Sequence, residues 1–87
     1  MAIVWDPNKQ RLNLAKHKVD FVDIDEEFFN DPNGLVIPDN DHDEQRFVRL
    51  AVNSVGDMFL AVYAYDVNGD TRLISARKPS SKERKAY

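Results

Sequence analysis

Met58-Phe-Leu-Ala-Val-Tyr-Ala-Tyr65 is the segment that decides the fold of this 87-residue chain. It is apolar on both of its faces, which is typical of a central β-strand covered on each side. Turn sequences enclose it, with Ser54-Val55-Gly56-Asp57 before it and Asn68-Gly69 after it. An Asn-Gly pair is a strong hairpin signal, because a type I′ turn needs a positive φ at both central residues. The sequence therefore predicts two hairpins that share residues 58–65.

Three further strands are predicted around this segment. Residues 46–53 alternate with a period of two, as expected for a strand. Residues 71–78 follow the second turn as the last strand. Leu35-Val36-Ile37 is a short strand that Pro38 is expected to close. We expect these four strands to form an antiparallel meander with residues 58–65 inside it.

Alternation along the last strand assigns its side chains to two faces. One face would carry Thr71, Leu73, Ser75 and Arg77, and the other would carry Arg72, Ile74, Ala76 and Lys78. The two cations at the end of the strand then lie on opposite faces, so only one of them can enter a given pocket.

The N-terminal segment predicts a strand followed by a helix. Ile3-Val4-Trp5 has strand character and is expected at an edge of the sheet. Asp6-Pro7 starts a helix that runs to about His17, because aspartate caps a helix N-terminus and proline suits the first helical position. The expected apolar stripe of this helix is Leu12, Ala15 and Val19.

Two more helix starts are visible in the sequence. Asp20 begins a second helix, with Asp23 as a weak capping-box residue, and the turn sequence of residues 30–34 ends it. Ser80 and Glu83 form a capping box that opens a short terminal helix up to Tyr87.

The order of these elements predicts a single α+β domain over residues 1–87: two N-terminal helices, an antiparallel β-sheet meander and a short C-terminal helix. Hydrophobic residues make up 43% of the chain, which excludes disordered and low-complexity classes. The chain has no cysteine, which excludes thiolate metal sites. No apolar run approaches the roughly 20 residues of a membrane span, and the N-terminus lacks the pattern of a secretory signal. We therefore expect a cytoplasmic protein.

The net charge of −3 hides an uneven distribution along the chain. Residues 20–45 carry ten acidic groups and no lysine or arginine, whereas residues 1–19 have a net charge of +3 and residues 71–87 one of +5. If the fold brings the two ends together, they form a basic patch. Solvated surface with a chance bias remains the alternative.

Two histidines are present, and they differ in their surroundings. His42 lies among acidic residues, but the loop lacks the glycine and the distal glutamate of a calcium site, so we expect neither a metal nor a cofactor. His17 stands at a helix end between Lys16 and Lys18. The helix end favours its charged form and the lysines oppose it, so His17 is a candidate for proton exchange near neutral pH or a plain surface histidine.

Basic side chains with one aromatic residue gather near the C-terminus. They are Arg77, Lys78, Lys82, Arg84, Lys85 and Tyr87. Guanidinium groups bind phosphates bidentately, which metal-independent RNA cleavage requires. Basic strand ends and helix faces are common, however, and Glu83 fits the capping box better than the role of a base. Signatures of serine proteases, P-loop nucleotide hydrolases and zinc hydrolases are absent from the sequence.

Several motifs along nearly the whole chain resemble the BrnT family of toxins. Trp5-Asp6, Lys9, Asn13 and Lys16-His17-x-Val19-x-Phe21 resemble its opening signature. Asp31-Pro32, Asp41-His42 and Arg46-Phe47 resemble its middle, and Ile74-Ser75-Ala76-Arg77, Glu83-Arg84 and Tyr87 resemble its end. The resemblance implies a RelE-like α+β fold and the ribonuclease half of a type II toxin–antitoxin module. It also implies neutralisation by a BrnA-like antitoxin, through which alone the toxin would meet DNA.

The resemblance also implies roles for individual residues. Arg77 would be the main phosphate-binding cation and Arg84 a second one. Lys16 and His17 would supply a cation and an acid or base, and Tyr87 would stack on a base or donate a proton. The residues expected to bind the RNA substrate around them are Lys9, Asn13, Lys78 and Lys82.

Lys18 departs from the family pattern, which usually has glycine there. The helix before it must therefore enter the left-handed region without a glycine, or end differently. The acidic net charge is a second departure, because RNA-cleaving toxins are usually basic. The alternative function is therefore a catalytically weak or inactive module that binds an antitoxin-like, DNA-binding partner.

Overall fold

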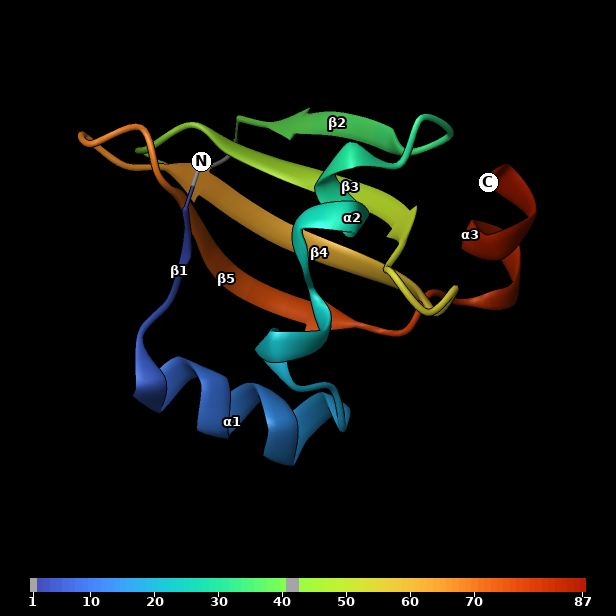
Figure 1. The fold of residues 1–87 in the computed structure, drawn as a ribbon, viewed down its shortest axis with the longest axis horizontal. Helices are drawn as coiled ribbons and strands as arrows, with labels where there is room; N and C mark the ends of the chain where they lie inside the picture. The colour runs from blue at the N-terminus through green and yellow to red at the C-terminus, as the bar shows by residue number, and fades with distance from the viewer. Residues whose placement is uncertain (1, 41–42) are drawn as a thin grey trace.

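Five strands form one sheet with the order β1-β5-β4-β3-β2 in the computed structural model, which describes residues 2–40 and 43–87 (Figure 1). The strands are β1 Ile3–Val4, β2 Leu35–Asp39, β3 Arg46–Val52, β4 Met58–Tyr65 and β5 Thr71–Arg77. β4 is the middle strand, as its apolar sequence predicts. Helices between β1 and β2 and after β5 complete an α+β fold, and this confirms the predicted fold class.

The strands β2 to β5 form the predicted antiparallel meander, and β1 adds a parallel strand beside β5. Ile3 lies opposite Thr71, and the N–H of Thr71 donates to the carbonyl of Ala2 at 2.8 Å. The expected edge position of the first strand is confirmed, and the sheet as a whole is mixed. The chain leaves β1 through a helix and rejoins the sheet at the opposite edge, so no hairpin forces β1 and β5 to be antiparallel.

β2 continues through Pro38 to Asp39, so the prediction that Pro38 closes this strand is wrong. β2 pairs only with β3 and is the other edge of the sheet. Proline lacks the N–H of a central strand but is tolerated on an edge strand, which needs a ladder on one side only.

Asn53 and Asp66 close the two predicted hairpins in the same way. The backbone N–H of each donates to the carbonyl four residues on, at 2.9 and 3.0 Å. Gly56 and Gly69 in these turns have φ values of 85° and 80°, while no other residue of either turn has a positive φ. The second turn is therefore a type I turn with a glycine bulge, and the predicted type I′ turn is wrong.

A β-bulge interrupts the pairing of β5 with β4. Tyr63 lies opposite Leu73 and Val62 lies opposite Ser75, so Ile74 has no partner in the register. Beyond the bulge the alternation is inverted, because one extra residue lies on the bulged strand. Leu73 and Ala76 are consequently both buried under the helices. Ser75 and Arg77 share the opposite face, so the predicted grouping of Arg77 with Thr71 and Leu73 is wrong.

The first helix, α1 Pro7–His17, begins and ends as its sequence predicts. The Asp6 side chain accepts the N–H of Asn8 at 2.8 Å as N-cap, and Pro7 is the first helical residue. Lys18 ends the helix in the left-handed region, with φ 60° and ψ 26°. Lysine therefore adopts at this position the left-handed conformation for which glycine is the usual residue.

The buried residue of α1 is Asn13, and the predicted apolar stripe is wrong for this helix. Leu12 is 65% exposed, whereas Asn13 is 6% exposed. The Asn13 amide donates to the carbonyls of Val19 at 2.9 Å and Ala76 at 2.8 Å, and it accepts the N–H of Ala76 at 3.0 Å. β1 covers only the first two residues of β5, so α1 packs against a strand edge whose backbone groups need polar partners.

The predicted second helix is divided into two short elements. Asp20 caps a 3₁₀ turn, η1 Phe21–Asp23, and Asp25 caps α2 Glu26–Asn30. Asp25 breaks the helix because its carboxylate accepts the N–H of Phe28 at 3.0 Å and also bonds Ser54 beyond β3. The terminal helix α3 Ser81–Ala86 has the predicted Ser80–Glu83 capping box.

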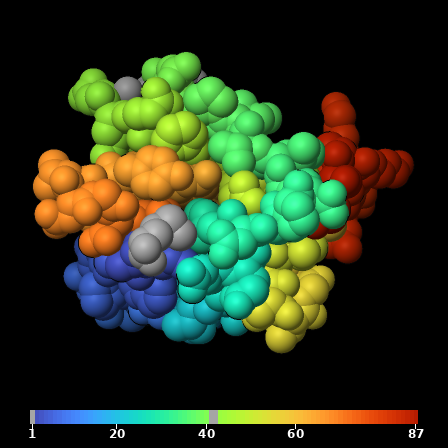
Figure 2. All heavy atoms as spheres, turned by 45° about the horizontal axis from the view of Figure 1, so that its top comes forward, coloured from blue at the N-terminus to red at the C-terminus, as the bar shows by residue number. Residues whose placement is uncertain are grey.

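The core lies between η1 and α2 on one side and a single face of the sheet on the other (Figure 1). It contains Val19, Phe21, Ile24, Phe28, Ala51, Phe59, Ala61, Tyr63, Leu73 and Ala76. α1 flanks the β5 edge, and α3 lies at a different end of the molecule (Figure 2). No helix within residues 2–40 and 43–87 is long and apolar enough to cross a membrane.

Replacing Asn13 with alanine should lower the free energy of unfolding by about 2–3 kcal/mol, because it leaves buried backbone groups of Ala76 and Val19 without partners. Urea unfolding measures this loss. The matched control is Leu12→Ala on the exposed side of the same turn, which should change stability by less than about 0.5 kcal/mol. Equal losses in both variants would contradict the role of the Asn13 amide.

Candidate functional site

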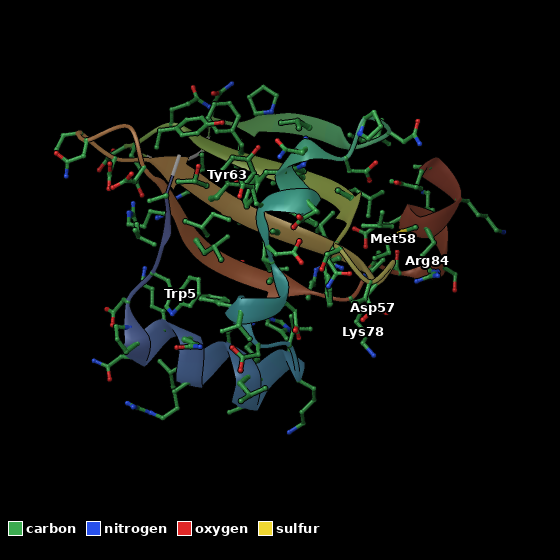
Figure 3. All side chains as sticks on the ribbon, viewed as in Figure 1. Trp5, Asp57, Met58, Tyr63, Lys78 and Arg84 are labelled. Atoms are coloured by element: carbon green, nitrogen blue, oxygen red, sulfur yellow. The ribbon has the colours of Figure 1, made fainter. Side chains whose placement is uncertain are left out.

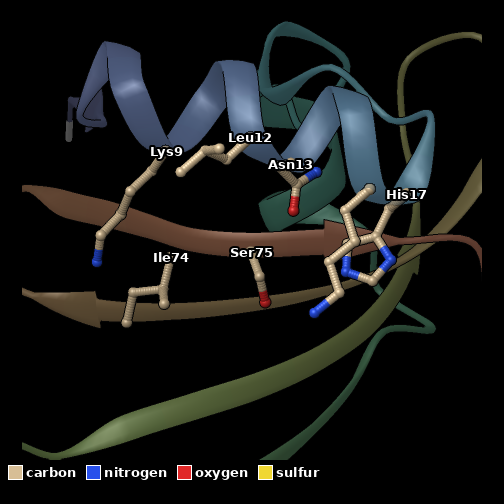
Figure 4. A pocket seen from close by; sticks show the side chains of 7 residues that line it. Lys9, Leu12, Asn13, His17, Ile74 and Ser75 are labelled. Atoms are coloured by element: carbon tan, nitrogen blue, oxygen red, sulfur yellow. The ribbon is translucent and has the colours of Figure 1, made fainter.

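A groove of about 240 Å³ runs between α1 and β5 (Figure 4). Its lining residues are Lys9, Leu12, Asn13, Lys16, His17, Ile74 and Ser75. The helical residues recur at spacings of three and four, which places them on one side of α1. The β-bulge supplies the other wall, because it brings both Ile74 and Ser75 to the groove.

The groove combines cations with an apolar floor. Lys9, Lys16 and His17 contribute basic groups, and none of them takes part in an ion pair within the described part of the chain. Leu12 and Ile74 contribute the apolar surface. Ammonium groups attract phosphates, and apolar side chains can pack against a base or a sugar. The groove is therefore suited to a segment of single-stranded nucleic acid.

Asn13 lines this groove but has a structural function of its own. Both polar atoms of its amide already bond to backbone groups of Val19 and Ala76. These bonds hold the last turn of α1, with Lys16 and His17, beside the end of β5. The assignment of Asn13 to substrate binding stays a prediction.

Arg77 lies two residues beyond Ser75 on the same face of β5, about 7 Å further along the strand. Its guanidinium makes a bidentate ion pair with Glu83 of α3, in which Nη1–Oε1 and Nη2–Oε2 are both 2.8 Å. Nη1 also donates to the carbonyl of Lys78 at 3.2 Å. Hydrogen bonding to Arg77 holds the pKa of Glu83 at about 2, well below its ordinary value, and raises the pKa of Arg77. Glu83 is thus both a capping residue and the partner of Arg77.

Lys78 and Arg84 line a separate hollow of about 210 Å³ beside the β3–β4 hairpin. Asp57 and Met58 lie next to them (Figure 3). Lys82 is exposed on α3 and lines neither this hollow nor the groove of α1. The groove therefore brings together four of the predicted site residues and the hollow two, while Lys82 belongs to neither. Arg77, at the end of β5, directly precedes Lys78 of the hollow and lies two residues beyond Ser75 of the groove.

Tyr87 is held away from the groove. Its phenol donates a hydrogen bond to the Asp31 carboxylate, which also accepts the N–H of Val52 at 3.0 Å. This bond raises the pKa of Tyr87 and lowers that of Asp31. The roles of Tyr87 in base stacking or proton donation stay predictions.

Sequence reasoning missed three contributors to this region. Ser75 and Ile74 were expected on opposite faces, and Leu12 was expected in the core. The sequence also did not predict the Arg77–Glu83 pair, because two residues that form an ion pair across a turn have no fixed separation in sequence. The capping box, which places Glu83 close to the end of β5, was the one signal that could have indicated it.

Asp41 and His42, which carry part of the family resemblance, lie outside the described residues. Among residues 2–40 and 43–87, no group of three or more His, Asp or Glu side chains could hold a metal ion.

Comparisons with known proteins agree with the resemblance. A family model described as the ribonuclease toxin BrnT of type II toxin–antitoxin systems matches residues 5–83. The crystal structure of the Brucella abortus ribonuclease toxin BrnT superposes with a TM-score of 0.77 at 27% sequence identity. The match covers 93% of this chain and 99% of that one. No protein with a curated description matches.

The Arg77–Glu83 pair should make stability depend on pH. The folded-state pKa of Glu83 is lowered from 4.5 to about 2, so its contribution is fully present above pH 4.5 and is lost as the pH falls through about 2. The Glu83→Gln variant should therefore be less stable than wild type at neutral pH, and the difference should shrink toward pH 2. Urea unfolding across this range measures it, and a difference that is independent of pH would contradict the charged pair.

Proposed function

This chain belongs to the BrnT family of ribonuclease toxins of type II toxin–antitoxin systems, and on that premise we propose that it cleaves RNA without a metal ion, in the groove between α1 and β5. The observation that supports this site is the groove itself: Lys9, Lys16 and His17 line it, and no carboxylate among residues 2–40 and 43–87 forms an ion pair with them. Arg77 emerges two residues beyond its Ser75 wall.

The reaction is an internal transesterification. The ribose 2′-oxygen attacks the adjacent phosphorus, the P–O5′ bond breaks, and the products are a 2′,3′-cyclic phosphate and a free 5′-hydroxyl. His17 takes up the proton of the 2′-hydroxyl as the general base, because a neutral imidazole nitrogen can accept a proton. The leaving O5′ takes its proton from a water molecule, and the hydroxide that remains takes the proton from His17, which restores the base. Lys16 and Arg77 stabilise the negative charge that builds up on the phosphorane.

The remaining basic residues bind the RNA on either side of the cleaved bond. Lys9 contacts a neighbouring phosphate in the groove. Arg84, Lys78 and Lys82 contact phosphates beyond the end of β5, where the first two share a hollow. Their positions around Arg77 let one strand of RNA follow both groups of cations. Tyr87 stacks on a base after release from Asp31.

The partner that neutralises the toxin is a BrnA-like antitoxin, and DNA is reached only through it. The acidic side chains of residues 20–40 and 43–45 offer a surface for a basic segment of that partner. We assign the activity to residues 1–87 as one domain, in the cytoplasm, where substrate RNA and antitoxin are made.

The alternative is an interaction module without catalysis. The observation that favours it is that Glu83 already occupies one side of the Arg77 guanidinium. The two functions differ in the result of a cleavage assay on the purified chain.

Arg77→Ala should reduce RNA cleavage by roughly 10²–10³-fold and relieve growth inhibition, because it removes a charge-stabilising donor. Arg77→Lys should restore little, since a point charge does not replace a planar fork. The matched control is Lys78→Ala, which removes the next cation and should be much milder. Each folded variant is compared with wild type on total RNA. Equal cleavage by Arg77→Ala and wild type refutes the assignment, and no cleavage by either supports the interaction module.

Cleavage should continue at an unchanged rate in excess EDTA. The positive charge at the groove comes from lysine and arginine side chains, so chelation removes nothing that the reaction uses. A metal-dependent nuclease assayed in the same buffer controls for effective chelation. Loss of activity that magnesium restores would contradict the metal-independent reaction.

A further inference from the structure

We propose that Glu83 is a positioning residue that fixes the Arg77 guanidinium and leaves its Nε–Nη2 edge as the fork that takes the scissile phosphate. This inference rests on the proposed function, in which Arg77 stabilises the phosphorane. It assigns to Glu83 a purpose beyond capping α3.

The hydrogen bonds of Arg77 carry the inference. A guanidinium has five N–H donors. Nη1 uses both of its donors, on Lys78 O at 3.2 Å and on Glu83 Oε1 at 2.8 Å, and Nη2 uses one, on Glu83 Oε2 at 2.8 Å. The donors left are Nε–H and the second Nη2–H, for which the described residues offer no acceptor. These two point the same way along one edge of the plane, and such an edge binds two phosphate oxygens bidentately.

The carboxylate that fixes Arg77 is itself fixed. Glu83 Oε1 accepts the N–H of Ser80 at 2.7 Å, and the N–H of Glu83 donates to Ser80 Oγ at 3.2 Å. The capping box therefore ties the carboxylate to the first turn of α3, directly after β5. The Arg77 guanidinium is therefore held by the backbone carbonyl of Lys78 and by the Glu83 carboxylate, so the plane of the guanidinium has little freedom to turn.

The geometry also separates this role from two others. Glu83 is a poor general base, because its lowered pKa keeps it ionised and weakly basic. An inhibitory role would require phosphate to displace Glu83 from Arg77. The phosphate does not need to displace Glu83, because the Nε–Nη2 edge of Arg77 is open. Removal of Glu83 should therefore slow the reaction and not accelerate it.

The test compares single and double variants of the purified full chain, using a labelled single-stranded RNA that wild type cleaves. Glu83→Gln keeps the size and one acceptor of the side chain but loses the bidentate charged pair. We expect kcat to fall roughly 10- to 100-fold, the effect of misplacing a catalytic group, with KM little changed. In an Arg77→Lys background, Glu83→Gln should have almost no further effect, because lysine has no plane to orient.

Ser80→Ala is the control for a merely structural role. It removes the Oγ of the capping box and destabilises α3 but leaves the Ser80 N–H and the carboxylate pair, so kcat should stay close to wild type. If Ser80→Ala lowers kcat as much as Glu83→Gln at matched thermal stability, Glu83 acts only through the helix and the inference is overturned. A rise in kcat in Glu83→Gln overturns it too, since Glu83 would then be a competitor of the phosphate. Full activity in Arg77→Ala refutes the proposed function itself, whereas an inactive Arg77→Ala with a fully active Glu83→Gln refutes only the inference.

Discussion

The side-chain amide of Asn13 replaces a missing strand, and the arrangement of the candidate site depends on it. β1 covers only the start of β5, and the amide satisfies both backbone groups of Ala76 further along that edge. A helix held by an amide can lie close to the strand without an apolar seam between them. This leaves Lys9, Lys16 and His17 free to line the groove, because none of them is needed to cover a core.

The acidic segment has a comparable structural use, which the net charge does not show. Asp20 accepts the side-chain amide of Gln10 at 2.8 Å and the N–H of Val22 at 3.2 Å. Asp25 and Asp31 join the same segment to the sheet through the backbone N–H groups of Ser54 and Val52. These carboxylates act as caps and connectors, so part of the negative charge belongs to the fold. A chain that is acidic overall can therefore still present a basic groove.

Local patterns predicted most of the fold, and pairing decided the rest. The apolar segment of β4, the Asp6-Pro7 helix start and the Ser80–Glu83 box each depend on neighbours in sequence, and all three are confirmed. The bulge at Ile74 depends on how β5 registers with β4, which no local pattern contains. The same holds for Asn13, whose partner Ala76 is 63 residues away. These two non-local features form the groove. The sequence could therefore identify single residues of the groove, but it could not predict that they lie together.

The contact between the two ends of the chain has a consequence for synthesis. β1 can pair only after β5 exists, and Asn13 waits for Ala76 near the end of the sequence. Contacts of such long sequence separation form late, because a large loop must close first. On a translating ribosome, α1 therefore emerges with no strand to pack against, and the groove closes only after β5 has left the tunnel. A nascent chain of this topology has no groove until β5 has emerged, so the assembled site appears late relative to the helix that lines it.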